Sequence, residues 1–234
     1  IGISAASTNT VPIKKIISRA IVVRIATGMT LRGFSVSPAA IPISSVPEKA
    51  KFTATINGQK TGPHELPKDL MMIEFLQEYQ GLPGPPLGCG QGVCRACTVI
   101  VDEPGKGSHT VPACVTGISW LNGKSIRTIE GAASTDDKGQ PVASAVQQAF
   151  LEHFSFQCGY CTPGFVNSAT VLMEQLRAKP VAANAVEEAV EAALDKHICR
   201  CTGYVRYYHA VRDLILATPG LTTGQRTREV SRHG

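Results

Sequence analysis

Eight cysteines in two compact sets constrain this chain of 234 residues more than any other feature of its sequence. The first set has the spacing C-x4-C-x2-C with a fourth member farther along, and it comprises Cys89, Cys94, Cys97 and Cys114. This is the plant-type spacing of a [2Fe-2S] site. Gly88, Gly90 and Gly92 permit positive φ angles, so backbone N–H groups can approach the sulfur atoms without an intervening side chain. The spacing therefore predicts an iron–sulfur cluster held by this loop.

The second set combines a C-x2-C with a C-x-C, and it comprises Cys158, Cys161, Cys199 and Cys201. Each half precedes a predicted helix, and the positive end of a helix dipole favours thiolates and an anionic cluster. A second [2Fe-2S] cluster is the prediction, so the eight cysteines divide into four and four.

Other roles for these cysteines are less consistent with the pattern. Two sets that use every cysteine argue against buried free thiols, and disulfides rank lower still. Structural zinc commonly takes paired C-x2-C motifs, which neither C-x4-C nor C-x-C matches. A Rieske centre needs histidine ligands, but no histidine follows a cysteine at C-x-H or C-x2-H, and we expect His197 to lie on the surface. A zinc-stapled interaction protein without redox function remains the second interpretation.

Composition and charge limit the class of protein. With 43% hydrophobic and 18% charged residues, the chain is typical of globular proteins, and no run of about 18 apolar residues predicts a membrane span. Residues 1–47 hold five Lys or Arg and no acid, whereas the remainder has 18 basic and 18 acidic residues. The folded part therefore lacks the excess basic charge of a nucleic-acid-binding core. Because the first residue is Ile1, we expect the start codon to lie upstream or to have been processed away.

Periodicity predicts two folded domains between two extensions. We expect a basic N-terminal extension over residues 1–50, a small mixed sheet with one helix over 51–131, a helical domain over 132–218 and a polar tail over 219–234. Within the first domain we expect a β-hairpin at Asn57-Gly58, a helix over 70–79 capped by Asp69, and strands at 98–101 and 125–129. In the second domain, helices are predicted over 141–153, 163–178, 184–194 and 204–218, and four helices suggest a bundle.

The sequence offers no candidate catalytic residue. No Ser/His/Asp arrangement or pair of carboxylates stands out from the surface charges. The predicted chemistry is therefore one-electron transfer alone.

Four motifs carry a resemblance to a known family, and they are Gly88 to Cys94, Cys97 to Val99, Phe156 to Gly164 and Cys199 to Tyr204. Over about residues 51–218 the chain resembles the iron–sulfur subunit or domain of the xanthine oxidase family of molybdenum hydroxylases. The resemblance implies an α+β fold, in which a plant-ferredoxin-like (β-grasp) domain precedes an all-α four-helix-bundle domain. It also implies one [2Fe-2S] cluster in each domain, and a large partner subunit that binds molybdopterin.

The same resemblance implies an order of electron carriers. The cluster of the helical domain is implied to be proximal to the pterin, and that of the ferredoxin-like domain to be distal, on the exit side. Gln157 and Cys201 match family positions that approach the pterin. Two departures stand out: Arg95 replaces a glycine that usually follows the second cysteine, and residues 81–87 are rich in proline. The chain itself is implied to carry electrons and to perform no substrate chemistry.

The N-terminal extension suggests a subgroup. Ile13, Ile16 and Ile17 share one face of a possible helix, a pattern typical of an interfacial helix or a partner groove. With this N-terminal extension, the chain is similar to the small subunit of membrane-associated aldehyde dehydrogenases of acetic acid bacteria. That similarity implies oxidation of an aldehyde to a carboxylic acid, a cytochrome c subunit and quinone as acceptors, and peripheral membrane contact on the periplasmic side of the inner membrane. The alternatives are an N-heterocycle hydroxylase of the isoquinoline or xanthine type, and a cytoplasmic location.

Overall fold

The computed structural model describes residues 47–224. The predicted N-terminal extension, with the apolar face at Ile13 to Ile17, lies almost wholly outside the described residues, as does the tail from 225 onward. We call residues 47–131 the sheet part and residues 132–224 the helical part.

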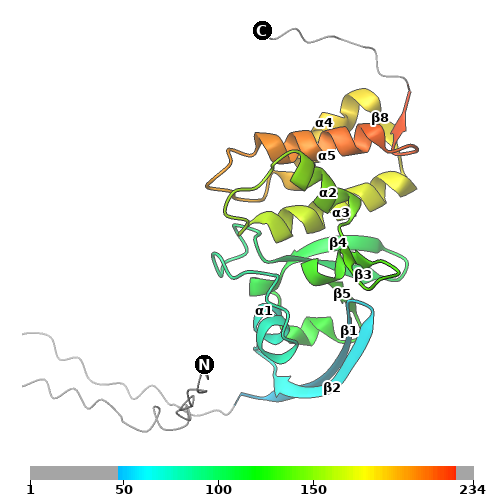
Figure 1. The fold of residues 1–234 in the computed structure, drawn as a ribbon. Coiled ribbons are helices and arrows are strands. Elements are labelled where there is room, and N and C mark those ends of the chain that lie inside the picture. Colours follow the sequence, from blue (N-terminus) through cyan, green and yellow to red (C-terminus); the bar gives the residue numbers. More distant parts are fainter. Residues whose placement is uncertain (1–46, 225–234) are drawn as a thin grey trace, which may run out of the picture. The chain divides into compact units, whose positions relative to one another are not determined.

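A five-stranded sheet forms the first of these parts, with the strand order β2-β1-β5-β3-β4 within the described residues (Figure 1). Its strands are β1 (Lys49–Ile56), β2 (Gln59–Pro67), β3 (Thr98–Glu103), β4 (Gly107–Pro112) and β5 (Ser125–Arg127). β5 pairs parallel with β1 and antiparallel with β3. The predicted hairpin is confirmed: β1 and β2 pair antiparallel across Asn57 and Gly58, whose φ angles are 48° and 82°. Two positive φ angles at these positions match the right-handed twist of the paired strands.

A short helix packs against this sheet. It runs as α1 (Met72–Glu74) and continues as a π-helix over Phe75–Tyr79. Its apolar side chains share a core with the inward-facing residues of β1, β3 and β5. The predicted cap at Asp69 is wrong, because Met71 is extended and forms a bridge with Gly117, so the helix begins only after it. The helix is instead capped at Met71, whose backbone N–H donates to Glu74 at 3.1 Å.

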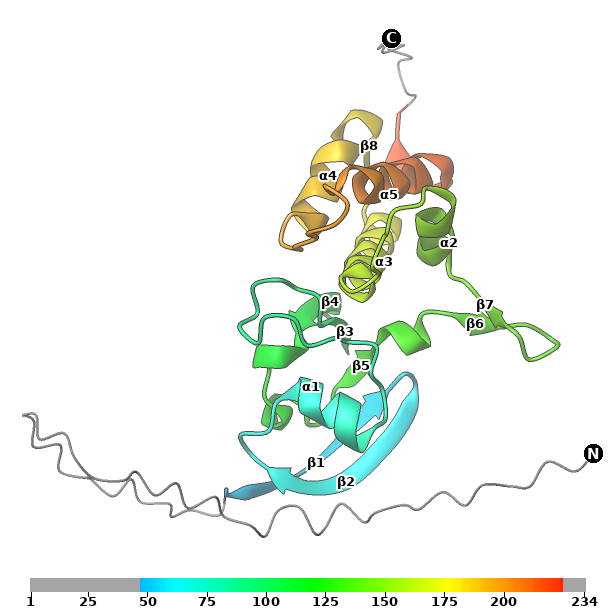
Figure 2. The same ribbon diagram turned by 60° about the vertical axis from the view of Figure 1, so that its left-hand side comes forward.

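Four α-helices follow within the described residues, and they are α2 (Ala145–Glu152), α3 (Thr162–Ala178), α4 (Val186–Leu194) and α5 (Val205–Ala217). Each lies inside or close to a predicted helix, whereas their arrangement as a four-helix bundle stays a prediction. The start of α2 differs most, because Pro141 belongs to β7 (Pro141–Val142), which pairs with β6 (Ser134–Thr135) (Figure 2). Ser144 and Gln147 then cap α2 reciprocally, each side chain bonding the other's backbone N–H.

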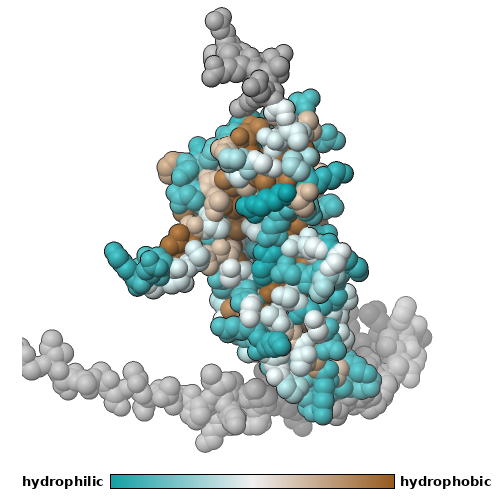
Figure 3. Space-filling model, turned by 90° about the vertical axis from the view of Figure 1, so that its right-hand side faces the viewer, coloured by the Kyte–Doolittle hydropathy of each residue, from teal (hydrophilic) through white to brown (hydrophobic). Residues whose placement is uncertain are grey.

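The helical part has its own apolar core, and its surface also carries apolar side chains, shown in brown in Figure 3. Leu221 belongs to that core with 1% of its surface exposed, although it lies in the segment predicted as a polar tail. Beside it, β9 (Thr222–Thr223) pairs parallel with β8 (Val181–Ala182). Among residues 47–224 no helix combines the length and the apolar composition that crossing a membrane requires.

The two parts contact each other along α3, which runs beside β3 and β4 (Figure 1). Arg127 donates hydrogen bonds of 2.8 and 2.9 Å to Glu174 of α3 and to Asp102 of β3. Burial favours the neutral form of Glu174, but the bonds from Arg127 outweigh it and hold the pKa of this carboxyl below its usual range. The Asn167 side-chain amide also donates to the Thr98 carbonyl at 2.8 Å. Charged and neutral ties therefore fix α3 on the sheet.

Candidate iron–sulfur sites

The first cysteine set lies at one end of the sheet part. Cys89, Cys94 and Cys97 belong to the loop between the π-helix and β3, and Cys114 lies in a 3-10 turn directly after β4. Cys97 and Cys114 are buried, with 1% and 7% of their surface exposed, whereas Cys89 and Cys94 are partly exposed. Pairing of β3 with β4 brings the end of the loop and the 3-10 turn together, because Ala113 N–H donates to the Cys97 carbonyl at 3.2 Å.

The loop backbone is shaped around sulfur, as the glycine pattern predicted. The N–H groups of Gln91 and Cys94 point at the Cys89 sulfur, at 3.3 and 3.4 Å. These two donors lower the pKa of Cys89 to about 6. A Cβ atom at Gly88 would lie 2.8 Å from the Cys94 sulfur, so only glycine fits beside it. The loop thus stabilises a thiolate with backbone N–H groups.

Arg95 occupies a left-handed conformation, with φ 59°. This is the position at which the resemblance leads one to expect glycine, and a left-handed φ explains that preference. The conformation is held by Thr98, whose backbone N–H and hydroxyl both donate to the Arg95 carbonyl, at 3.1 and 2.7 Å. The chain therefore keeps the local geometry with a larger residue.

The second set lies where two helices begin. Cys161 is the N-cap of α3 with Cys158 just before it, and Cys199 and Cys201 lie in the loop that leads into α5. The sulfur atoms of Cys158 and Cys201 are 3.5 Å apart, and both residues are exposed. Cys161 and Cys199 are buried beneath them. Gln157, the other residue implied to approach a pterin, is also exposed.

Each set holds its four thiols close together. All eight cysteines lie among the described residues, and none is in a disulfide. Burial, together with neighbouring Cys114 and Cys94, raises the pKa of Cys97 to about 12. In the second set, burial and neighbouring Cys199 raise the pKa of Cys161 to about 12.

These shifts bear on what each set can bind. Crowded thiolates repel one another, so a cationic centre is needed to hold all four in ionised form. Within residues 47–224 no three or more Cys, His, Asp or Glu side chains are arranged to hold a single metal ion. Each set consists of four cysteine sulfur atoms, none of them in a disulfide. This donor set fits a [2Fe-2S] cluster in each part of the chain.

A cavity of about 280 Å³ lies between the two sets. Cys89 and Cys94 of the first set and all four cysteines of the second line it, together with Tyr160 and Ile198. The two candidate sites therefore share a wall at the contact between the sheet part and the helical part.

His197 was predicted to lie on the surface, and this is wrong. The residue is 4% exposed, its ring packs tilted against Phe165 with 4.7 Å between ring centroids, and its Nε2 lies 3.2 Å from the Ser168 hydroxyl. Burial lowers its pKa to about 4, so the imidazole is neutral. After α4 the chain returns to α3. This brings His197 against Phe165 and Ser168, just before the cysteines that follow.

Two polar side chains beside the second set were not anticipated from the sequence. The Tyr207 hydroxyl lies 3.7 Å from the Cys161 sulfur and 2.8 Å from the Thr162 hydroxyl. The Thr202 hydroxyl lies 3.0 Å from the Cys199 sulfur. Helical spacing places Tyr207 on the buried face of α5, but only the fold shows that its hydroxyl reaches a cysteine. Burial raises the pKa of Tyr207, so this group stays a neutral donor.

Comparison with known proteins gives two family matches. The family described as "[2Fe-2S] binding domain" matches residues 128–212, and the family described as "2Fe-2S iron-sulfur cluster binding domain" matches residues 54–118. Each match contains one cysteine set entire. The chain therefore has two [2Fe-2S]-binding domains.

Similar whole proteins include two small subunits. The chain is 39% identical over 142 residues to the nicotine 6-hydroxylase small subunit of Paenarthrobacter nicotinovorans, covering 61% of this chain and 76% of that protein. It is 36% identical over 166 residues to the xanthine dehydrogenase iron-sulfur-binding subunit of Escherichia coli O157:H7, covering 71% and 94%. Among solved structures, quinoline 2-oxidoreductase of Pseudomonas putida 86 matches with TM-score 0.59 and 30% identity, covering 74% of this chain and 94% of the matched chain. An aldehyde oxidoreductase of Desulfovibrio gigas matches with TM-score 0.58 and 29% identity, covering 76% and 19%.

Proposed function

The chain belongs to the family of iron–sulfur subunits of molybdenum hydroxylases, and from this premise we propose that it conducts electrons from a molybdopterin-binding partner subunit to an external acceptor. The observation that carries the proposal is the pair of four-cysteine sets on either side of one cavity. When bound, each [2Fe-2S] cluster supplies reversible one-electron chemistry. No residue of the chain is assigned a catalytic role.

The proposed ligands follow the two sets. Cys89, Cys94, Cys97 and Cys114 hold the distal cluster in the ferredoxin-like domain, and Cys158, Cys161, Cys199 and Cys201 hold the proximal cluster in the helical domain. Backbone N–H groups at the Cys89 sulfur, and the hydroxyls of Thr202 and Tyr207 at the second set, stabilise negative charge on sulfur. Different donors and different burial at the two sets support different reduction potentials.

The Tyr207 hydroxyl provides a test of this tuning. Tyr207→Phe should lower the reduction potential of the proximal cluster by about 20–60 mV, because one hydrogen bond contributes about 0.5–1.5 kcal/mol and 59 mV is tenfold for one electron. The distal potential should stay unchanged. A redox titration followed by EPR measures both potentials in one sample.

Tyr208→Phe is the matched control, since it removes a hydroxyl from the same helix, where Tyr208 lines a surface pocket with Glu187 and Arg212 and with none of the cysteines. An equal shift in both variants, or no shift in Tyr207→Phe, would show that Tyr207 does not act on the proximal cluster.

The surface around Gln157 and Cys201 is the proposed contact with the molybdopterin subunit. Both residues are exposed, and so are apolar side chains within four positions of them in the chain: Phe154 is 73% exposed, Val205 57% and Phe156 37%. Exposed aromatic and aliphatic groups of this size are typical of surfaces that a partner covers. This supports placing the proximal cluster next to the pterin.

For the complex we propose an aldehyde as substrate, oxidised to a carboxylic acid. The similarity to a Desulfovibrio gigas aldehyde oxidoreductase supports this. A second candidate is an N-heterocycle, and it is favoured by the higher identity to the nicotine 6-hydroxylase small subunit. The substrate pocket belongs to the partner, so both candidates are decided on the complex.

We further propose a cytochrome c subunit and quinone as the acceptors, with the complex bound peripherally to the periplasmic side of the inner membrane. Residues 1–47 hold five basic residues and no acidic ones, and this net positive charge supports attraction to anionic lipid. Deleting residues 1–46 and comparing membrane fractionation at low and high salt tests this. Unchanged fractionation would refute the membrane contact, and recovery in the cytoplasm would favour the alternative location.

The complex itself tests the proposed function. An affinity tag on this chain should recover a large subunit that contains molybdenum, and visible absorbance of the complex should bleach within one turnover after substrate is added. Aldehydes and N-heterocycles are offered separately to distinguish the two candidates. The chain purified without its partner should oxidise neither. Turnover by the chain alone, or recovery of zinc in place of iron, would refute the proposal.

A further inference from the structure

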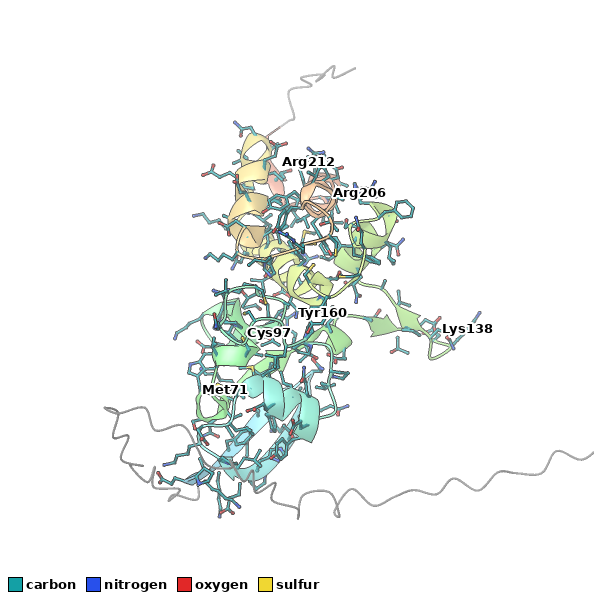
Figure 4. The ribbon with its side chains drawn as sticks, turned by 90° about the vertical axis from the view of Figure 1, so that its left-hand side faces the viewer. Met71, Cys97, Lys138, Tyr160, Arg206 and Arg212 are labelled. Carbon is teal, nitrogen blue, oxygen red and sulfur yellow. The ribbon has the colours of Figure 1, made fainter. Side chains whose placement is uncertain are left out.

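Tyr160 belongs to the second cysteine set by sequence but reaches the first set in space. It stands between Cys158 and Cys161, at the start of α3, and Figure 4 labels it where the helices meet the sheet part. Its hydroxyl donates a hydrogen bond of 2.7 Å to the carbonyl of Leu87. A Cβ atom at Gly88 would lie 3.7 Å from the Tyr160 ring, so the ring packs on the backbone that leads into Cys89.

The segment that ends at the acceptor carbonyl of Leu87 is conformationally restricted. Residues 81–87 contain three prolines, whose fixed φ angles limit how the backbone can move. The Gln77 side chain also donates to the carbonyl of Pro85 at 2.7 Å, which ties the segment to the π-helix. The Leu87 carbonyl is therefore an acceptor on a restricted backbone, and the Tyr160 hydroxyl donates to it.

A second hydrogen bond crosses the same contact. The N–H of Ile198 donates to the carbonyl of Cys94 at 3.1 Å. It joins a cysteine of the first set to the residue that precedes Cys199 of the second, through backbone atoms only. The two bonds, Tyr160 to Leu87 and Ile198 to Cys94, thus hold one loop of each set against the other.

We propose that Tyr160 is a positioning residue, which fixes the distance and orientation of the first cysteine set relative to the second and so sets the electronic coupling between the two clusters. The inference rests on the proposed function. With a cluster bound by each cysteine set, the step it would govern moves one electron: the proximal cluster, reduced by the molybdopterin subunit, would be oxidised by one electron and the distal cluster would be reduced by one. No bond or proton changes, and an external one-electron acceptor removes the electron.

Among the side-chain hydrogen bonds between the two parts described above, the bond from Tyr160 is the one that reaches residues 87–94, where the backbone bond from Ile198 to Cys94 assists it. The bonds of Arg127 to Glu174 and of Asn167 to Thr98 join α3 to the sheet without touching residues 87–94. Losing the Tyr160 hydroxyl should therefore leave the two parts docked. Only the two cysteine loops should become more mobile. The population in which they are apart, relative to the population in which they are in contact, should rise by about two- to tenfold, the range expected for the loss of one hydrogen bond.

The test compares three forms of the holo-complex: wild type, Tyr160→Phe and the control Tyr208→Phe. Two readouts are used: the magnetic splitting between the two clusters in the EPR spectrum of the dithionite-reduced protein, and the rate of electron transfer between them after pulse reduction. In Tyr160→Phe both EPR signals and the iron content should persist, the splitting should weaken or broaden, and the rate should fall by about two- to tenfold. Tyr208→Phe should match wild type.

Each other outcome decides against a stated part of the account. Unchanged splitting and rate in Tyr160→Phe, or equal changes in the control, would overturn the positioning role. Loss of a cluster in Tyr160→Phe would also overturn it, since Tyr160 would then retain a cluster rather than position one. A wild-type complex without two EPR signals would instead refute the proposed function, and so the two failures are distinguishable.

Discussion

Replacing Cys97 with alanine should remove one of the two EPR signals and lower the iron content from about four to about two per chain. Cys97 is 1% exposed and is packed beside Cys114, so water cannot readily replace its sulfur as a ligand. The distal cluster should therefore be lost entirely. Because the second set is built from other segments of the chain, the proximal signal should persist. Iron analysis and EPR of the purified variant measure both effects.

Cys161→Ala is the reciprocal variant and should remove the other signal. Cys161 is buried at the N-terminus of α3, 3.7 Å from Tyr207, and belongs to the set that does not contribute to the distal site. Val115→Ala is the matched control, because Val115 is 47% exposed next to Cys114 and carries no sulfur. If either cysteine variant lost both signals, or if both variants lost the same one, the division into two sets of four would be incorrect.

Gly164→Ala should be among the most destabilising single substitutions in the chain. A Cβ atom at Gly164 would lie 2.3 Å from the carbonyl oxygen of Arg95 and 3.1 Å from the His197 ring. The carbonyl is backbone, held by two hydrogen bonds from Thr98, and cannot shift cheaply. We expect the free energy of unfolding to fall by about 1–3 kcal/mol, the usual cost of overpacking, with a Tm lower by several degrees. Thermal unfolding of the cluster-loaded chain measures the change.

Gly117→Ala is the control for this substitution. Its φ is −73° and a Cβ atom there meets nothing within 4 Å, so stability should be unchanged or slightly higher. Equal stability of Gly164→Ala and wild type would mean that α3 and the first cysteine loop do not approach as closely as described.

Sequence patterns predicted the parts of the fold that depend on neighbours in the chain. The Asn57-Gly58 turn and the alternation before it predicted a hairpin, since both signals are local. The short spacings within the cysteine motifs are local signals too, whereas the assignment of the eight cysteines to two clusters of four stays a prediction. Helices were found because apolar side chains recur at helical spacing, although α2 begins later than predicted, where Pro141 pairs in a strand instead.

Features that depend on distant contacts were missed. β4 carries polar residues and was not predicted, because its pairing with β3 rather than its own pattern makes it a strand. His197 was placed at the surface because its burial comes from Phe165 and Ser168, about thirty positions away in sequence. The bond from Tyr160 to Leu87 spans 73 positions, and no local signal could reveal it.

The central claim, that this chain carries two distinct [2Fe-2S] clusters, is tested most directly by one measurement on the purified wild-type chain. EPR spin quantification after dithionite reduction, on a sample whose iron and zinc are measured, should give two different signals of about one spin each and about four irons per chain, with little zinc. A colourless protein that contains zinc, or a single signal with about two irons, would contradict the account.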